Sequence, residues 1–463
     1  MKLTRFSRRD FLRTSSLALP LAGGGWILGG CHTPAPKAKP TGSSDDFVSV
    51  RNGRFELRGQ PYSFVGANLW YACYLGAPSL PGGRARLVRE LDRLQKLGVT
   101  NLRLLAGSER SALTAAVRTA ITEAPGVWNE DLLQGLDFCL TEMAKRDQRA
   151  VLYLTNYWQW SGGMAQYVCW ATGEAIPDPD QPPGGGDWGA FMRFSARFYR
   201  TPEAQKMFRA SLSHLLTRRN TCTGHAYADD PTIMAWELAN EPRPGPDEAS
   251  SREHLPAFYE WVDGTASFIH SLAGHQLVTP GTEGLAGSLQ DPQVFLKAFR
   301  SPAIDYVNVH LWVKNWGWLK EPKLGLQYEA AAAKGLAHIE EHIALATDDL
   351  HKPLTMEEFG IPRDGESLAP SSPTAMRDDY YRKMFHCVEE SCAAGRALQG
   401  ANFWAWGGEG RAGSSPSTAA AAFVGDPFCE PQGLNSVFDT DRATLVIIAQ
   451  ANETLRRTRP RAG

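Results

Sequence analysis

Short apolar segments alternate with amphipathic segments of helical periodicity from Tyr62 to the end of the chain. The first amphipathic segment places four leucines, from Leu87 to Leu97, at helical spacing, and Gly98 follows as a stop signal. Apolar strands joined by helical crossovers form a parallel sheet that is buried on both faces. Eight segments qualify as such strands: 64–70, 101–105, 150–154, 233–239, 277–281, 306–312, 353–358 and 400–406. This number predicts an α/β protein with a single (β/α)₈ barrel, the TIM-barrel architecture, rather than an open sheet.

An Asn52-Gly53 pair lies inside an alternating segment, residues 47–57, ahead of the first predicted strand. Asn-Gly between alternating apolar residues is the strongest short signal for a hairpin with a two-residue turn. We therefore expect a short β-hairpin that covers the floor of the barrel. The barrel domain is predicted to span residues 47–456, with a tail at 457–463 and no second domain.

The first thirty residues have the features of an export signal. Arg8-Arg9 is a twin-arginine pair, and a weakly apolar, glycine-rich run follows at 17–30. Leu28-Gly29-Gly30-Cys31 resembles the lipobox of bacterial lipoproteins, in which the cysteine becomes the lipidated first residue. A membrane-spanning anchor is the alternative, but the run is short and contains Pro20. Residues 1–30 are thus predicted to be a twin-arginine lipoprotein signal.

Residues 31–46 are predicted to be the lipidated Cys31 and a flexible tether, because the segment is rich in Pro, Lys, Ala, Gly and Ser. The chain is then expected to be anchored to a membrane through its N-terminal lipid, in the periplasm, at the outer membrane or at the cell surface. His32 follows Cys31 in place of the aspartate that retains lipoproteins at the inner membrane, which favours the outer membrane.

The charge balance argues against a nucleic-acid partner. Removal of residues 1–30 reduces 48 basic and 50 acidic residues to 43 and 49, a net charge of −6. Seven of the eight cysteines remain beside Cys31, scattered and without a CxxC or Cys/His cluster. We read most of these thiols as buried small hydrophobes, with no pairing that the sequence defines, and we expect a monomer.

Loops that follow the strands of a (β/α)₈ barrel form its functional face. Long segments follow the third, fourth, sixth and eighth predicted strands, at 156–190, 243–255, 313–326 and 407–432. The first of them is dense in Trp, Gly and Pro. Function is therefore expected at the carboxyl ends of the strands.

Asn240-Glu241-Pro242 follows the fourth predicted strand directly. A general acid needs an environment that raises its pKa, and a strand end beside apolar side chains can supply one. Asn240 could then donate a hydrogen bond to a ligand hydroxyl. The alternative is that Asn-Glu-Pro only caps a helix or a turn.

Met356-Glu357-Glu358-Phe359-Gly360 brings a second carboxyl to the end of the seventh predicted strand. Neighbouring side chains of a strand point to opposite faces, so only one of the two glutamates can point into the mouth of the barrel. This reasoning leaves Glu357 and Glu358 equivalent. Paired carboxyls on two strand ends suggest glycoside hydrolysis.

Four segments in the same order resemble family 5 of the glycoside hydrolases, within the large retaining (β/α)₈ clan: 236–242, 307–310, 356–360 and 402–404. The similarity covers roughly residues 47–452. It implies that Glu241 is the acid/base and Glu358 the nucleophile of a double displacement that retains configuration. The two carboxyls should then lie about 5 to 5.5 Å apart, and no metal or organic cofactor is needed.

Other positions carry over from the family one at a time, as residues that bind substrate or support the nucleophile. Arg103 matches an arginine that braces the nucleophile, and a cation there should keep Glu358 ionised. His310 matches a histidine that lines the cleft, and Trp404 matches the tryptophan floor of the sugar site. Many relatives have a tyrosine where this chain has Trp312, whose indole can donate a hydrogen bond but not accept one.

Tryptophans are concentrated at the predicted strand ends and in the loops behind them, where flat apolar faces can stack on sugar rings. Some must be core residues. We expect Trp70, Trp158, Trp160, Trp312 and Trp404, together with Asn240, to contact substrate. The others in this set are Trp170, Trp188, Trp316, Trp318 and Trp406.

Segments 66–76 and 158–170 resemble the β-mannanase branch of family 5, as do 240–244 and 314–318. The resemblance implies an endo-β-1,4-mannanase that acts on mannan, glucomannan or galactomannan. An endo-β-1,4-glucanase or a mannan transglycosylase on the same scaffold is an alternative. A glycan-binding surface lipoprotein without catalytic activity is another.

Overall fold

The computed structural model describes residues 44–181, 185–411 and 419–457. The predicted signal, Cys31, most of the tether and nearly all of the predicted tail lie outside these residues. Within the described ranges, no helix combines the length and the apolar character needed to cross a membrane.

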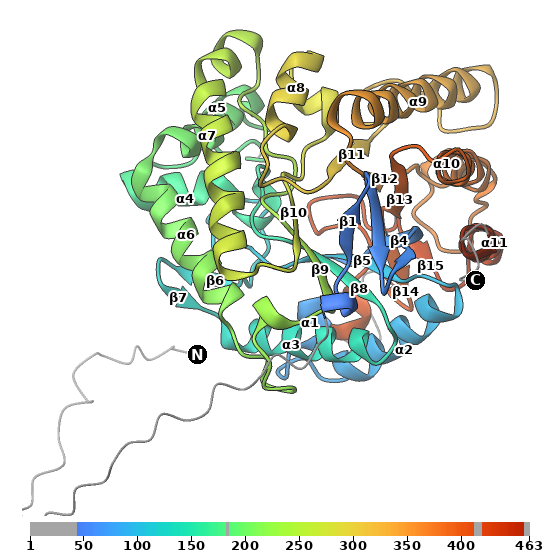
Figure 1. Ribbon diagram of the computed structural model, residues 1–463, viewed down its shortest axis with the longest axis horizontal. Helices are drawn as coiled ribbons and strands as arrows, with labels where there is room; N and C mark the ends of the chain where they lie inside the picture. Colours follow the sequence, from blue (N-terminus) through green and yellow to red (C-terminus); the bar gives the residue numbers. More distant parts are fainter. Residues whose placement is uncertain (1–43, 182–184, 412–418, 458–463) are drawn as a thin grey trace, which may run out of the picture. The chain divides into compact units, whose positions relative to one another are not determined.

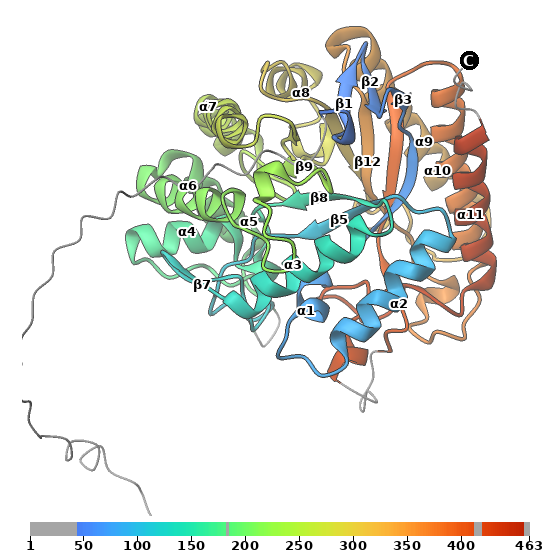
Figure 2. The same ribbon diagram turned by 60° about the horizontal axis from the view of Figure 1, so that its bottom comes forward.

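The eight predicted strands form one parallel sheet that curls into a barrel (Figures 1 and 2). Each strand differs from its predicted range by a few residues at most, and all strand residues are buried because helices cover the sheet from outside. In sheet order the strands are β10 (Leu277–Thr279), β9 (Ile233–Glu237), β8 (Arg149–Tyr153), β5 (Asn101–Leu105), β4 (Phe64–Asn68), β13 (Leu398–Phe403), β12 (Leu354–Phe359) and β11 (Val307–Leu311).

The barrel closes between β10 and β11 without a regular backbone ladder. Asp305 N–H donates to the Val278 carbonyl at 2.9 Å, and the Thr279 hydroxyl donates to Asn308 Oδ1 at 3.0 Å. Asn308 Oδ1 also accepts the Gly281 N–H at 3.1 Å. The Asn308 side chain therefore supplies part of the hydrogen bonding that a backbone ladder would provide along this seam.

Helices surround the barrel, and α2 packs through one apolar face. In α2, Leu87, Leu91 and Leu94 are buried as predicted, and Gly98 ends the segment with a φ of +77°. The helices are α1 (Ala72–Gly76), α2 (Gly83–Lys96), α3 (Glu130–Ala144), α4 (Gly163–Thr172), α5 (Trp188–Ala196), α6 (Pro202–Leu216), α7 (Glu248–Leu272), α8 (Pro292–Phe299), α9 (Leu326–Ala344), α10 (Ala375–Ala393) and α11 (Arg442–Arg457).

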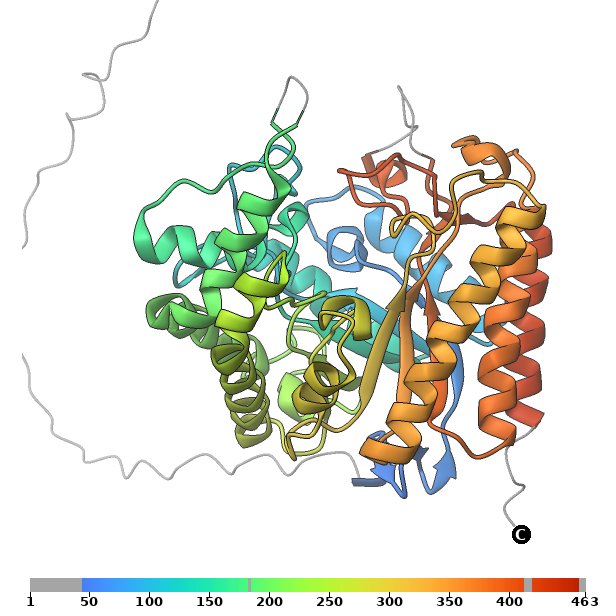
Figure 3. The same ribbon diagram turned by 90° about the horizontal axis from the view of Figure 1, so that it is seen from above.

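The predicted hairpin is confirmed, and it carries a third strand that the sequence did not reveal. β1 (Ser49–Arg51) and β2 (Arg54–Leu57) are joined by Asn52 and Gly53, both with positive φ as a type I′ turn requires. A second two-residue turn leads to β3 (Gln60–Pro61). Figure 3 shows this small sheet in blue at one end of the barrel strands. It covers the floor by packing against Val151, Met234, Leu277 and Tyr306.

The segments after the strands hold more regular structure than expected. Residues 156–190 contain the whole of α4, and the connection after β5 carries a hairpin of β6 (Thr122–Ala124) and β7 (Val127–Trp128). The connection after β13 starts with β14 (Trp406–Gly408), which pairs with β15 (Val437–Phe438).

The expectation that most thiols are buried is wrong, since only Cys73 and Cys139 are fully buried among the seven described cysteines.

The last helix is bonded to the first barrel strand. Asn452 of α11 accepts the Val65 N–H at 2.9 Å and donates to the Val65 carbonyl at 3.0 Å. The two residues are 387 positions apart. One amide side chain thus satisfies both backbone groups of a β4 residue from the outside of the barrel.

Candidate active site

A cleft of about 500 Å³ lies at the carboxyl ends of the barrel strands. It contains Asn240, Glu241 and Glu358, which the sequence predicted to lie together. Six tryptophans line it: Trp158, Trp160, Trp188, Trp312, Trp316 and Trp404. The concentration of tryptophan on this face is therefore confirmed for six of the ten that were singled out.

Glu241 lies four residues after the end of β9, and its side chain enters the cleft. Its backbone has a φ of +51°, which is rare for a residue other than glycine, and its N–H donates to the Gly281 carbonyl at 2.8 Å. Oε1 lies 2.6 Å from Nδ1 of His310, and Oε2 accepts the indole N–H of Trp158. Burial raises the pKa of Glu241, while the nearby Arg243 opposes the shift.

Glu358 lies at the carboxyl end of β12 and reaches the same cleft. Oε1 accepts a hydrogen bond from Nη1 of Arg103 at 2.5 Å, and Oε2 accepts the indole N–H of Trp312 at 3.1 Å. Glu357 points to the barrel interior, where Oε1 accepts the Tyr306 hydroxyl at 2.7 Å. The choice that strand alternation alone left open is thus made by geometry, in favour of Glu358.

The two cleft carboxyls are close to each other. One oxygen of Glu241, one oxygen of Glu358 and a ring nitrogen of His310 all lie within 4.8 Å of one another. Carboxyls that activate a water between them are about 6.5 to 9.5 Å apart, whereas a nucleophile and an acid/base pair are about 5 to 5.5 Å apart. The observed separation favours the second arrangement.

Arg103 fixes the positions of the two segments that carry the cleft carboxyls relative to each other. Its guanidinium donates to both oxygens of Glu237, at 2.6 and 2.7 Å, to Asn240 Oδ1 at 2.7 Å and to Glu358. It is fully buried and does not contact the cleft, so it supports the site from beneath. The predicted contact with Glu358 is present, but burial outweighs it and the pKa of Glu358 lies well above its usual range.

Two of the predicted substrate contacts are corrected. His310 is completely buried below the carboxyls and does not line the cleft; burial lowers its pKa to about 3, so the imidazole is neutral. Trp70 is 1% exposed and donates its indole N–H to the Gly425 carbonyl. Its ring packs edge-on against Trp160, so it supports a cleft tryptophan from behind. Trp70 is buried in the hydrophobic core, as are its neighbours on the chain, including Tyr71.

The remaining predicted contacts lie in the cleft. Trp404 and Trp312 meet edge to face, with ring centroids 6.1 Å apart, on the side of Glu358. The indole N–H of Trp404 is buried and has no hydrogen-bond partner within the described chain. Asn240 donates to Asn156 Oδ1 at 3.1 Å, which leaves a second amide hydrogen for a ligand.

Sequence reasoning missed several polar residues of the cleft. Arg243 and Glu283 form an ion pair, and the guanidinium lies 5.1 Å from the centre of the Trp158 ring. Asp180 and Glu430 line another part of the cleft. Arg243 follows Glu241 closely enough to have been noticed, but Glu283, Asp180 and Glu430 lie in loops whose local sequence carries no signal.

Two groups of side chains have the spacing of possible metal ligands: Glu241, His310 and Glu358, and Glu237, His310 and Glu357. Arg103 is bonded to a carboxylate in each group. A divalent cation would therefore lie next to a fixed positive charge, which is electrostatically unfavourable. The chemistry of these donors does not favour a metal.

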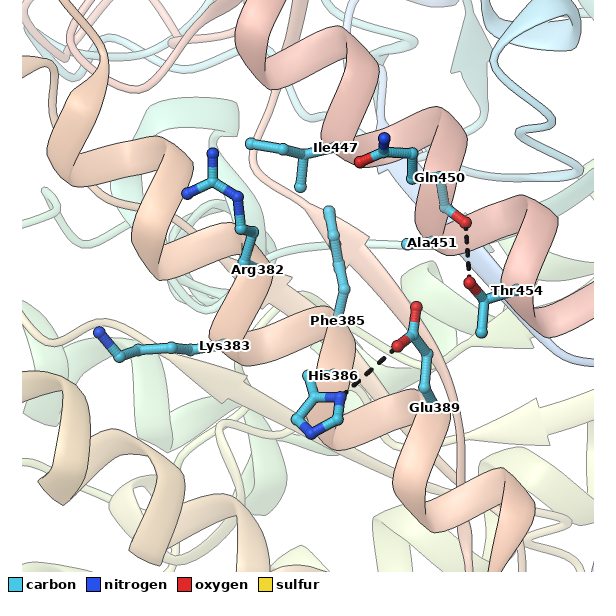
Figure 4. A pocket seen from close by; sticks show the side chains of 9 residues that line it. All are labelled: Arg382, Lys383, Phe385, His386, Glu389, Ile447, Gln450, Ala451 and Thr454. Carbon is cyan, nitrogen blue, oxygen red and sulfur yellow. Dashed lines mark hydrogen bonds and ion pairs between the residues drawn. The ribbon is translucent and has the colours of Figure 1, made fainter.

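A second hollow, of about 390 Å³, lies on the outside of the barrel between α10 and α11. Figure 4 shows its apolar floor, with Phe385 and Ile447, and a polar rim on which His386 contacts Glu389. It contains neither a carboxyl pair nor a tryptophan. It therefore does not have the features of the cleft.

A buried carboxyl pair in a tryptophan-lined cleft, at the carboxyl ends of the strands of a (β/α)₈ barrel, defines a glycoside hydrolase. The family model "GH family 5 beta-mannosidase-like" matches residues 45–459. The chain belongs to glycoside hydrolase family 5.

Individual relatives agree with this assignment. Mannan endo-1,4-beta-mannosidase 1 of Oryza sativa subsp. japonica is 29% identical over 383 residues, which are 80% of this chain and 80% of that protein. The crystal structure of a family 5 mannosidase from Rhizomucor miehei is 34% identical, with a TM-score of 0.81 over 90% of this chain and 99% of that one. A mutant of the Rhizomucor miehei mannosidase in complex with mannosyl-fructose gives a TM-score of 0.80 at the same identity and coverage.

Proposed function

We propose that this protein hydrolyses β-1,4-mannosidic bonds in mannan, glucomannan or galactomannan with retention of configuration. The observation that carries the proposal is the pairing of Glu241 and Glu358, whose nearest oxygens are within 4.8 Å of each other in a cleft lined by tryptophans. The names of the plant relatives support cleavage within mannan chains.

In the proposed mechanism Glu358 attacks the anomeric carbon and forms a glycosyl-enzyme. Glu241 protonates the glycosidic oxygen as it leaves, and then removes a proton from the water that hydrolyses the intermediate. Two protonation states are required at the start, a charged Glu358 and a neutral Glu241. Burial raises both pKa values and so favours the neutral form of each carboxyl, whereas the Arg103 guanidinium, which is bonded to Glu358 and not to Glu241, favours the ionised form of Glu358.

His310 and Arg103 act on the carboxyls and not on the sugar. A neutral imidazole 2.6 Å from Glu241 can hold the carboxyl in position in either protonation state, because each ring nitrogen can donate or accept depending on the tautomer. Trp404, Trp312, Trp158 and Trp160 supply the apolar faces for the sugar rings. Asn240 supplies an amide donor.

Cleavage at chain ends is the second candidate. The Rhizomucor miehei relative is named a mannosidase, and the family model is described as beta-mannosidase-like. The product pattern from mannohexaose separates the two candidates, since internal cleavage gives several oligosaccharides at once and chain-end cleavage gives a single short product.

The substrate itself is tested on mannan, glucomannan and cellulose. Hydrolysis of cellulose in preference to mannan would contradict the proposal and favour an endo-glucanase, and accumulation of longer mannosides would favour a transglycosylase. A glycan-binding protein without activity would bind mannan equally well before and after Glu358→Ala and would release no reducing ends from it.

We also propose export by the twin-arginine route and anchoring through a lipid on Cys31. The support is the order of Arg8-Arg9, the apolar run and the lipobox-like segment that ends in Cys31. Replacing Arg8 and Arg9 by lysine should leave the protein in the cytoplasm, and Cys31→Ser should release it from the membrane fraction. Membrane association that survives Cys31→Ser would point to a spanning anchor instead.

A further inference from the structure

We propose that His342 is a positioning residue for the proposed acid/base, Glu241. It lies on α9, outside the barrel, and does not line the cleft. It holds the segment 280–287, called the β10 turn below, and this turn carries Glu283, which fixes Arg243 beside the acid/base. The inference rests on the proposed function, because it gives His342 a part in the protonation of Glu241.

Both ring nitrogens of His342 are bonded to backbone groups. Nδ1 lies 2.7 Å from the carbonyl oxygen of His338, one helical turn earlier, so Nδ1 carries the proton and donates. Nε2 accepts the N–H of Leu285, in the β10 turn, at 2.9 Å. One donor and one acceptor are what a neutral imidazole offers, and burial lowers the pKa of His342 to about 3. The ring therefore stays neutral and bonded to the turn down to strongly acidic pH.

The ring of His342 is held on several sides. It is fully buried, the His338 ring packs against it with centroids 4.4 Å apart, and Phe295 meets it edge-on at 5.1 Å. Phe295 belongs to α8, which lies beside α9 (Figure 1). On the side of the turn, Gly284 has a φ of +74°, and a Cβ there would lie 2.3 Å from Nε2. The turn is thus pressed against a fixed ring and bonded to it.

The β10 turn carries Glu283 into the cleft. Its buried carboxylate is bonded to the guanidinium of Arg243, and both side chains line the cleft. The guanidinium also lies over the ring of Trp158, whose indole N–H donates to Glu241. A displacement of the turn would therefore reach the surroundings of the acid/base through the pair of Glu283 and Arg243.

The pair acts on Glu241 through charge. Burial raises the pKa of Glu241, and the Arg243 cation opposes this shift. Burial also raises the pKa of Glu283, which Arg243 lowers and the neighbouring Glu241 raises further. Repulsion between two carboxylates is mutual, so a Glu283 that leaves its place should lower the pKa of Glu241. The other charged or titratable groups that act on Glu241 are His310, Glu358, Glu430 and, from beneath the cleft, Arg103.

The test measures the alkaline limb of kcat/KM for mannohexaose. Because the acid must be protonated, a lower pKa of Glu241 moves this limb to lower pH. We expect Glu283→Gln to move the limb by about one pH unit, the effect of one neighbouring charge. His342→Leu removes the bond to Leu285 and should move it in the same direction by less. His342→Gln keeps an acceptor for the Leu285 N–H and should stay close to wild type.

Two further variants separate positioning from a general loss of stability. The matched control, Ile339→Ala, removes a buried side chain from the same helix and leaves the bond to the β10 turn. It should lower the melting temperature without moving the limb. Gly284→Ala forces the turn and the His342 ring apart and should move the limb as His342→Leu does. It keeps the test decisive if His342→Leu does not fold.

The double variant His342→Leu/Glu283→Gln decides whether His342 acts through Glu283. Its limb should coincide with that of Glu283→Gln alone, because the carboxylate that His342 positions is already gone. Additive shifts would overturn the inference. So would an unchanged limb in folded His342→Leu and Gly284→Ala, and either result leaves the proposed function intact.

If wild type hydrolyses no mannan, the proposed function fails, and the pKa of Glu241 is measured without substrate. Carbon NMR of labelled glutamate carboxyls follows the titration, and the Glu241 signal is assigned by its loss in Glu241→Gln. A lower pKa of Glu241 in His342→Leu than in wild type and Ile339→Ala supports the positioning role. An equal pKa in all three overturns it.

Discussion

Nη1 of Arg103 lies 2.5 Å from Oε1 of Glu358, and the same guanidinium is bonded to Glu237 and to the residue before Glu241. One side chain thus sets the relative positions of the proposed nucleophile and the loop that carries the proposed acid/base. Because Arg103 is fully buried, its charge is compensated mainly by its ion pairs with Glu237 and Glu358.

Removal of this charge should destabilise the whole protein. Arg103→Met leaves Glu237 and Glu358 buried without a cation, and breaking a buried pair on one side costs about 3–5 kcal/mol. Urea unfolding measures the change. The matched control is Arg58→Met, which breaks a half-exposed pair with Asp147 and should cost about 0–1 kcal/mol. Equal losses in the two variants would argue against the role of Arg103.

Neighbouring glutamates of β12 should differ sharply in their effect on catalysis. Glu358→Gln removes the proposed nucleophile, so the rate of reducing-end release from mannohexaose should fall by about 10³-fold or more. Glu357→Gln keeps a group that can accept the Tyr306 hydroxyl in the barrel interior, so activity should stay within about tenfold of wild type. A larger loss of activity in Glu357→Gln than in Glu358→Gln would exclude Glu358 as the nucleophile.

Substitution of Glu241 should depend on the leaving group of the substrate. Glu241→Gln cannot protonate a departing sugar oxygen, so mannohexaose hydrolysis should fall by about 10²- to 10⁴-fold. An aryl β-mannoside with an acidic phenol needs no such proton, so its first step should be nearly unaffected and the glycosyl-enzyme should accumulate after a burst of phenol. If Glu241→Gln slowed both reactions equally, Glu241 would not be the general acid.

The alkaline limb of the pH profile should move in a defined direction when Trp158 is changed. The Trp158 indole donates to Glu241, which favours the ionised carboxyl and lowers its pKa. Trp158→Phe removes this donor, so the pKa of Glu241 rises. Since the acid must be protonated, kcat/KM should persist to higher pH. Trp188→Phe, in the same cleft but exposed, serves as the control. If the alkaline limb moved to lower pH in Trp158→Phe, the limb would report the titration of a group other than Glu241.

The barrel could be predicted from the sequence because its strands are short, apolar and buried on both faces, as in 101–105, where the predicted and observed ranges agree. Turn chemistry was equally informative at Asn52-Gly53. α4 was missed because Gly162 and Gly163 open it and Gly173 closes it, in a segment whose tryptophans and glycines indicated a loop. Helical packing in the folded chain outweighed these local signals.

The site residues that could be predicted are those whose place in the cleft follows from their position at the end of a strand. Glu241 and Glu358 stand at strand ends, a position that the order of strands defines. Trp70 and His310 also stand there, but how far each side chain is buried depends on residues from distant parts of the chain. Glu430 could not be found from its neighbours, because it lines the cleft together with Gln159 and Asp180, which lie 250 or more residues earlier.

The bonds between Asn452 and Val65 give the chain a folding order during synthesis. Val65 is made 387 residues before Asn452, the residue on α11 whose side chain bonds its backbone. β4 also waits for β13, with which Gly400 and Phe64 are in register. The barrel therefore cannot close until β13 has been made, and a chain that stops before residue 398 would leave an edge of β4 unpaired and open to aggregation.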